Sequence, residues 1–206
     1  MSAGPHPFHA PFPIEIEEHI IDQLVDHFAS IRNCSLTCRA WVPRSRFHLF
    51  GAVQITTGSA LDAVLDYFQT NPHMRPLVRS LATAPTPTER TRLLGTYPAS
   101  LIRMLPNLRR WEMRAPLVDA KNHPPKVFFH RTTLIQLRCS PITELHVSSI
   151  HFPSQGEFVR LISSIPLLRV LQCSDVHFGT TNGIPFNNAS PLRRRPKGLS
   201  TLQVSE

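Results

Sequence analysis

The 206-residue chain is long enough for one large domain or two small ones, and its 41% hydrophobic residues suffice for a folded core. It carries a formal net charge of +8, with 19 arginines and three lysines against 14 acidic residues, which is compatible with acidic partners. Its four cysteines form no disulfide framework, no signal peptide precedes them, and no apolar run reaches transmembrane length. We therefore expect a cytoplasmic or nuclear protein without a membrane partner. Residues 1–11 hold three prolines and little to bury, which predicts a disordered leader.

The segment 12–50 is expected to form three short helices. Pro13 suits a first helical position, and apolar residues recur at helical spacing from there to Phe28, over about four turns. Ser30 can cap a second helix, and Pro43 suits the start of a third.

The order of residues in this segment resembles the F-box motif. FPIEI (12–16) stands where that family has Leu-Pro-x-Glu-Ile/Leu, and LTCRAW (36–41) matches its closing Leu-Val-Cys-Arg-x-Trp. The following RSRFHLF (44–50) looks like the version common in mushroom-type fungi. Phe12 and Thr37 depart from the family, which usually has Leu and Val at these positions.

This resemblance implies docking on the small Skp adaptor of a cullin–RING ubiquitin ligase. The apolar stripes are also wider than three short helices can bury among themselves, which favours partner binding over a helical subdomain whose apolar residues are only core. Ile20, Leu24, Leu36 and Trp41 should contribute most, because large apolar side chains dominate interfaces. The expected adaptor-binding residues are Phe12, Pro13, Ile14, Ile16, Ile20, Ile21, Leu24, Leu36, Cys38 and Trp41.

Beyond residue 50, strand-like and helical segments alternate. The predicted helices are one capped by Ser59 and stopped by Asn71-Pro72, then 99–105 and 155–165, with a loop at 83–90. The predicted strands are 52–56, 77–82, 108–113, 132–139, 143–147, 168–173 and 199–204.

Two stretches, ITELHVSSIHF (142–152) and LRVLQCSDVHF (168–178), fit the leucine-rich-repeat frame. Weaker copies begin at Phe50, Val78, Leu108 and Leu199, so that successive starts lie 28, 30, 34, 26 and 31 residues apart. Ile150 and Val176 replace the usual Asn, so we expect no side-chain amide ladder. The resemblance implies a short, irregular, curved stack with parallel strands inside and helices outside. Leu145, Val147, Leu171 and Cys173 are expected to point into its core.

The predicted fold class is therefore α+β leaning towards α/β, with a three-helix F-box at 12–50 and a leucine-rich-repeat-like domain at 51–206. The alternative is a compact α/β domain with mixed sheet order. Over 114–141 the register stays open, because Leu134-x-x-Leu137-x-Cys139 could be a short repeat of its own. LSTLQV (199–204) looks like the strand of a further repeat, which predicts either an incomplete repeat domain or a poorly ordered last strand.

Catalytic motifs are missing from the sequence: it has no Gly-rich phosphate loop, G-x-S-x-G, H-E-x-x-H or paired C-x-x-C. We expect no enzyme, cofactor or metal site, but a substrate-recruiting subunit that binds a Skp-type adaptor, a cullin through it, and a protein substrate through the repeats. The alternatives are an F-box protein outside the ligase cycle and a basic nucleic-acid-binding module. Aromatic residues are not interleaved with the basic ones, which disfavours nucleic acid. The run RRRPK (193–197) is either a nuclear-import or acidic-partner patch or a solvated loop.

Overall fold

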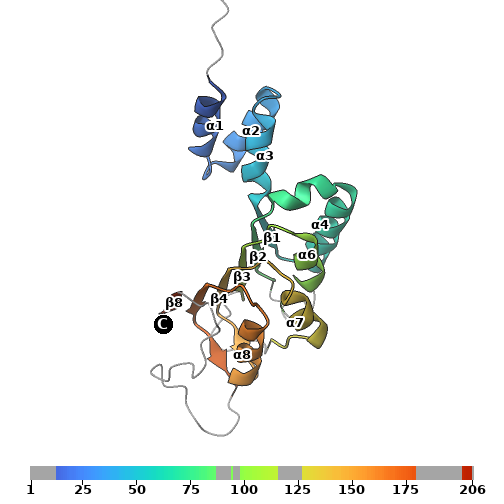
Figure 1. Cartoon of the computed structure of the whole chain (residues 1–206), viewed down its shortest axis with the longest axis vertical. Helices are drawn as coiled ribbons and strands as arrows, with labels where there is room; N and C mark the ends of the chain where they lie inside the picture. The colour runs from blue at the N-terminus through green and yellow to red at the C-terminus, as the bar shows by residue number, and fades with distance from the viewer. Residues whose placement is uncertain (1–12, 87–93, 95–97, 116–126, 180–200, 206) are drawn as a thin grey trace, which may run out of the picture. The chain divides into compact units, whose positions relative to one another are not determined.

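The computed structural model of the chain describes residues 13–86, 94, 98–115, 127–179 and 201–205 (Figure 1). The chain divides into two compact units, residues 1–51 and 52–206. This division lies one residue from the boundary expected from the sequence. The expected leader, the second half of the expected loop at 83–90 and the basic run at 193–197 lie outside the described residues.

Unit 1 consists of three helices, as predicted, but with different boundaries. They are α1 (Ile14–Asp22), α2 (Phe28–Thr37) and α3 (Val42–Gly51). The predicted four-turn first helix is wrong, because after Asp22 the backbone tightens into turns in which the Leu24 N–H bonds the Ile21 carbonyl at 3.0 Å. Pro13 precedes α1 as its cap, and Ser30 lies inside α2 instead of capping it.

The core of unit 1 takes one or two side chains from each helix. Ile21 of α1, Ile31 and Cys34 of α2 and Ser45 of α3 are buried. Such a small core follows from the size of the unit, since a segment of about 40 residues has little interior to fill.

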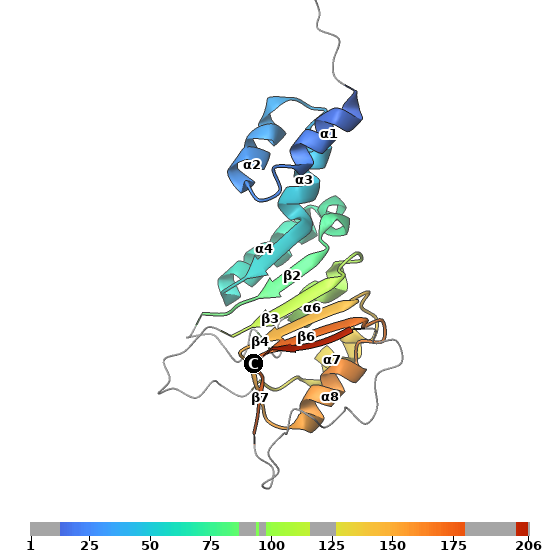
Figure 2. The same ribbon diagram turned by 90° about the vertical axis from the view of Figure 1, so that its left-hand side faces the viewer.

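Unit 2 is built on one six-stranded parallel sheet whose strand order equals chain order (Figure 2). Consecutive strands lie side by side throughout, in the order β1-β2-β3-β4-β6-β8. The strands are β1 (Ala52–Ile55), β2 (Ser80–Thr83), β3 (Arg110–Arg114), β4 (Glu144–Ser148), β6 (Val170–Ser174) and β8 (Thr201–Ser205).

The register of this sheet reproduces the spacing read from the sequence. The paired residues are separated by the predicted 28, 30, 34, 26 and 31 positions. Ala52 pairs with Ser80, Ser80 with Arg110, Arg110 with Glu144, Glu144 with Val170, and Val170 with Thr201. The alternative of a mixed sheet order is therefore excluded for these strands.

The helices of unit 2 lie on one face of the sheet (Figures 1 and 2). Right-handed crossovers between parallel strands that always step in the same direction place the connecting helices on that face. The helices are α4 (Gly58–Thr70), the 3₁₀ helix η1 (Pro72–Leu77), α6 (Pro98–Met104), α7 (Arg131–Leu137) and α8 (Gln155–Ser163).

Hydroxyl side chains cap two of these helices, α4 and α8. Thr57, not the expected Ser59, caps α4, because its Oγ1 accepts the Ala60 N–H at 3.1 Å. Ser154 caps α8 by accepting the Glu157 N–H at 3.3 Å. Each cap satisfies one of the N–H groups that a helix start leaves without an intrahelical acceptor.

The strand predicted at 132–139 is wrong, since α7 occupies most of these residues and a turn follows it. Its buried side chains are Thr133, Leu134 and Leu137, spaced as on one helical face. The His130 ring nitrogen accepts the Thr132 N–H at 3.4 Å before the first turn. The open question over 114–141 is thus answered for its described part: Leu134 and Leu137 belong to the helix between β3 and β4, not to a separate strand.

The core of unit 2 lies between sheet and helices. The prediction that Leu145, Val147, Leu171 and Cys173 share one register and point inward is confirmed, because Leu145 pairs with Leu171, Val147 pairs with Cys173, and all four side chains are buried.

A second small sheet extends this core beyond the ends of β4 and β6. Its strands are β5 (His151–Phe152) and β7 (His177–Phe178). Phe152 lies between Phe129 and Phe178, with ring centroids 6.2 and 6.1 Å apart and nearly parallel planes. Offset aromatic rows of this kind add to the stabilisation that burial alone gives.

Candidate partner-binding surface

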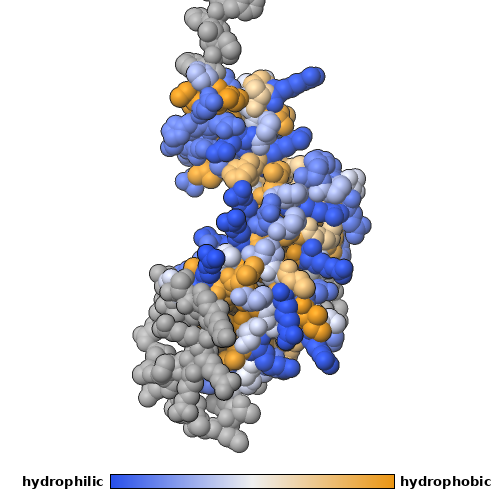
Figure 3. Space-filling model, viewed as in Figure 1, coloured by the Kyte–Doolittle hydropathy of each residue, from blue (hydrophilic) through white to orange (hydrophobic). Residues whose placement is uncertain are grey.

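Unit 1 exposes an unusual share of large apolar side chains. Among the described residues of the chain, eleven large hydrophobic residues are exposed, and six of them lie in this unit. They are Ile14 (45% exposed), Ile16 (48%), Ile20 (47%), Val25 (56%), Phe28 (63%) and Leu36 (77%). Figure 3 shows hydrophobic residues on the surface near the start of α1. Apolar surface of this density is typical of binding sites.

Helical geometry explains which residues of α1 are exposed. Ile16 and Ile20 lie one turn apart and therefore share a face, whereas Ile21, the next residue, turns into the core. Leu36 lies in the last turn of α2, and Cys38 follows the helix in an exposed segment.

The ten predicted adaptor-binding residues fall into four groups. Pro13, Ile14, Ile16, Ile20, Leu36 and Cys38 are exposed, Leu24 and Trp41 are half-buried, Ile21 is fully buried, and Phe12 lies outside the described residues. Ile21 therefore holds the helices together and offers no surface to a partner.

A charged cluster clamps α1 onto α3. The Arg44 guanidinium donates two hydrogen bonds to the Asp22 carboxylate, from Nε at 2.6 Å and from Nη2 at 2.5 Å. His48 Nε2 lies 2.7 Å from the same carboxylate. The hydrogen bonds from Arg44 and His48 lower the pKa of Asp22 from 3.8 to about 2, and the bond to Asp22 raises the pKa of Arg44.

Two further polar contacts orient the surface. The Trp41 indole N–H donates to Glu17 Oε2 at 2.8 Å, which ties the residue before α3 to α1. The Thr37 hydroxyl, a departure from the F-box pattern, donates to the Asn33 carbonyl at 3.0 Å. Its hydrogen-bonding capacity is met within its own helix, so this residue leaves the apolar surface intact.

Unit 2 presents a polar face on the side of the sheet opposite the helices. Arg110 bonds Glu144 of the next strand at 2.8 Å, and Arg114 bonds Glu112 at 2.5 Å. His146 lies among these charges, and burial and Arg110 together lower its pKa. The face therefore offers charged and hydrogen-bonding groups but little apolar area.

The described residues hold no group of three or more His, Cys, Asp or Glu side chains that could bind a metal ion. All four cysteines are free, and burial raises the pKa of the Cys173 thiol to about 12, which makes this thiol a poor nucleophile. No helix in the described part of the chain is long and apolar enough to cross a membrane.

Sequence reasoning missed two parts of this surface. The apolar pattern predicts one continuous helix that runs through Val25 to Phe28, and the exposure of these two residues follows only from the break in the helix after Asp22. The pairing of Asp22 with Arg44 has no local signature either, because the two residues are 22 positions apart on different helices.

A comparison with protein-family models and a comparison with curated proteins found no match to this chain.

Proposed function

We propose that the chain is the substrate-recruiting F-box subunit of a Skp–cullin–RING ubiquitin ligase. Unit 1 binds the Skp-type adaptor, and unit 2 holds a protein substrate as a short, irregular, curved leucine-rich-repeat-like stack. The chain itself is not catalytic and contributes proximity between substrate and conjugating enzyme. The single observation that supports this most is the concentration of exposed apolar residues on α1, on α2 and between them, in a unit that also carries the F-box order of residues.

The distribution of the exposed residues supports an interface over a core. Ile16, Ile20 and Leu36 are about half or more exposed, while Ile21 and Ile31 already fill the interior of the unit. Covering such side chains stabilises a complex by roughly 25 cal/mol per Å² of apolar area removed from water. A partner that covers both α1 and α2 therefore gains binding free energy from the exposed apolar side chains of each helix.

The test is capture of a Skp-type adaptor by the purified full chain. The variant Ile16→Ala/Ile20→Ala/Leu36→Ala should lose capture, because it removes exposed anchors and spares the core. The matched control, Val159→Ala/Leu167→Ala, truncates exposed apolar residues of unit 2 and should bind like the unmodified chain. Capture that survives in the folded triple variant would refute the docking assignment.

Cullin recruitment separates the proposal from its nearest rival. If the adaptor is captured but never brings a cullin with it, the chain is an F-box protein acting outside the ligase cycle. If neither is captured and nucleic acid co-purifies instead, the basic nucleic-acid-binding alternative replaces both.

A further inference from the structure

Helix α2 presents three exposed side chains that the core of unit 1 does not use. Phe28, Arg32 and Leu36 follow one another at intervals of four residues, so they share one face of the helix. Phe28 is 63% exposed and Leu36 is 77% exposed, and Arg32 between them is exposed as well. The buried residues of α2, Ile31 and Cys34, lie on another side of the helix. We call Phe28, Arg32 and Leu36 the α2 ridge.

Charge is segregated within unit 1, and the α2 ridge lies in the basic part. The five acidic residues of the unit all come before α2, whereas residues 27–51 hold four arginines and no acid. Arg44 is bonded to Asp22, but the Arg32 side chain has no ion-pair or hydrogen-bond partner among the described residues. The residues that precede α1 in the sequence contain no acid either. Arg32 is therefore an exposed cation between two exposed apolar side chains.

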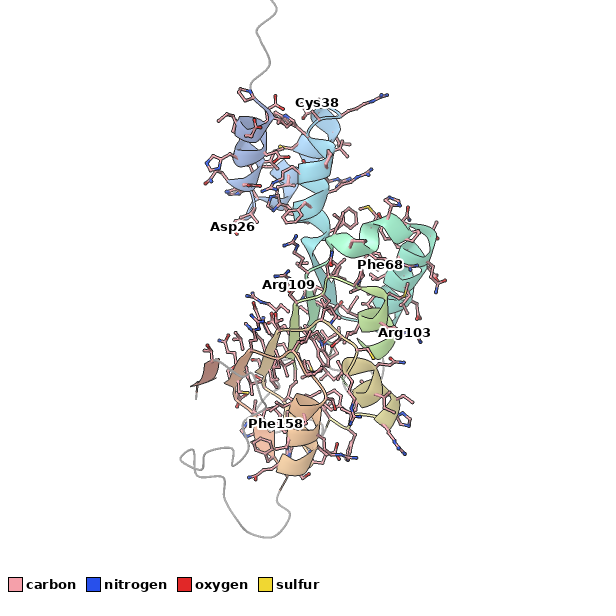
Figure 4. All side chains as sticks on the ribbon, in the orientation of Figure 1. Asp26, Cys38, Phe68, Arg103, Arg109 and Phe158 are labelled. Carbon is pink, nitrogen blue, oxygen red and sulfur yellow. The ribbon has the colours of Figure 1, made fainter. Side chains whose placement is uncertain are left out.

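The acid nearest to the ridge along the chain is Asp26, six residues before Arg32. Figure 4 shows Asp26 and Cys38 at opposite ends of unit 1, so this acid lies at the end of α2 that is far from Leu36. Six residues span about 9 Å where the chain is helical, which exceeds the Debye length of about 8 Å at physiological ionic strength. Asp26 therefore repels a carboxylate placed beside Arg32 only weakly.

We propose that the α2 ridge docks an acidic amphipathic helix of the partner, with a carboxylate of that helix opposite Arg32. This inference rests on the proposed function, because it gives the chemistry of the adaptor surface that covers α2. Side chains four residues apart form the kind of ridge that packs into the groove of a neighbouring helix. Phe28 and Leu36 are two turns apart, or ~12 Å, so about three turns of a partner helix cover the ridge. Arg32 then selects partners by charge, which affects specificity and association rate more than affinity.

The chemistry of the ridge favours a helix over a nucleic acid as the occupant. Binding of single strands needs several exposed aromatic rings on which successive bases stack, and the ridge has one, Phe28. Leu36, the most exposed member, offers only apolar contact. Both residues match leucines of an amphipathic helix, and Arg32 matches an acid between them.

The test is fluorescence anisotropy of the full chain, at low ionic strength, with a labelled stapled helix that carries leucines and glutamates on one face. The unmodified chain should bind this peptide, and Phe28→Ala/Leu36→Ala should lose binding, because it removes both exposed apolar contacts and spares the core. Arg32→Glu should weaken binding by about three- to tenfold, since an exposed ion pair becomes a repulsion. The same variant should bind more tightly to a matching peptide with lysine in place of glutamate. A loss of folding cannot produce such a reversal of preference.

The matched control is Arg103→Glu, which makes the same charge change at an exposed arginine of α6 in unit 2. Its affinities for both peptides should change by less than about twofold. An equal reversal in this control would overturn the proposal, because binding would then reflect net charge alone. A single-stranded oligonucleotide that binds more tightly than the glutamate peptide, and is lost in Arg32→Glu, would overturn the assigned occupant. An unmodified chain that fails to bind the glutamate peptide would also refute the proposal.

Capture of the Skp-type adaptor by the same variants separates this proposal from the F-box assignment. We expect both Phe28→Ala/Leu36→Ala and Arg32→Glu to weaken capture. Capture that is unchanged in both variants would overturn the α2 ridge as the adaptor's docking site and leave the F-box assignment standing. If the unmodified chain captures no adaptor but keeps its preference for the glutamate peptide, the F-box assignment is refuted, and the ridge stands as a docking site for an acidic helix of another protein.

Discussion

The Asp22 carboxylate should make the stability of unit 1 depend on pH in the acidic range. In the folded protein its pKa is about 2, and its ordinary value is 3.8. A carboxyl group whose pKa is lowered by folding stabilises the folded state fully above its unfolded pKa, and this stabilisation is lost as the pH falls towards the folded pKa. We therefore expect the contribution of Asp22 to be complete above about pH 5 and to disappear between about pH 4 and pH 2.

The size of this contribution follows from the pKa difference. A shift of this size corresponds to about 2.4 kcal/mol, at ~1.36 kcal/mol per pKa unit. The side chains of Asp22 and Arg44 are 29% and 32% exposed, so solvent screens part of the interaction. We expect about 1–2 kcal/mol after this reduction. Asp22→Asn should lower the free energy of unfolding of unit 1 by a similar amount at neutral pH.

The two tryptophans allow each unit to be followed separately. Trp41 belongs to unit 1 and Trp111 to unit 2, so 5-fluorotryptophan labelling gives one ¹⁹F resonance for each. Urea unfolding of the full chain, followed by the Trp41 resonance at pH values from 7 to 2, measures the stability of unit 1 alone.

The control is Asp26→Asn, which removes an exposed carboxylate from the same part of unit 1. This variant should keep the pH dependence of the unmodified chain, whereas Asp22→Asn should flatten it. If the Asp22→Asn chain loses as much stability between pH 5 and pH 2 as the unmodified chain does, the clamp does not stabilise the fold as argued.

Three further predictions concern unit 2 and the cysteines. Leu171→Ala should cost about 2–5 kcal/mol in urea unfolding followed by Trp111, because this fully buried side chain leaves a cavity; a cost near zero would contradict the register. Ser154→Ala should cost about 1 kcal/mol by the same measurement, while Ser154→Asp should restore the cap of α8 and with it the stability. Under native conditions at pH 8, a maleimide should modify the exposed Cys38 and spare the buried Cys173, and rapid labelling of Cys173 detected by mass spectrometry would show that unit 2 opens more readily than its packing implies.

Hydrophobic periodicity was sufficient to predict the sheet register because paired strands bury their side chains at equivalent positions. The frame that placed Leu145 and Val147 in the core also placed Leu171 and Cys173 there, and the paired residues have the predicted separations. This regularity follows from parallel pairing, since a one-residue slip would turn each buried side chain to the opposite face.

Helix boundaries in unit 1 were less predictable because long-range contacts set them. The apolar pattern alone continues past Asp22, and nothing near Asp22 in the sequence indicates that Arg44 and His48 hold its carboxylate. The same reasoning explains why the exposed Val25 and Phe28 could not be separated from core residues by spacing. Their exposure depends on where the chain turns, and tertiary contacts override local preference there.

The α7 error, in contrast, could have been avoided from the sequence. Leu134-x-x-Leu137 fits both the start of a repeat strand and one face of a helix, so local pattern cannot decide between them. Chain connectivity can decide, because a strand at 132–139 would leave three residues before the strand at 143–147. A connection of that length permits an antiparallel hairpin, whereas neighbouring parallel strands need a crossover of about a dozen residues. A parallel sheet therefore required a helix between β3 and β4, and residues 131–137 were the apolar segment able to provide it.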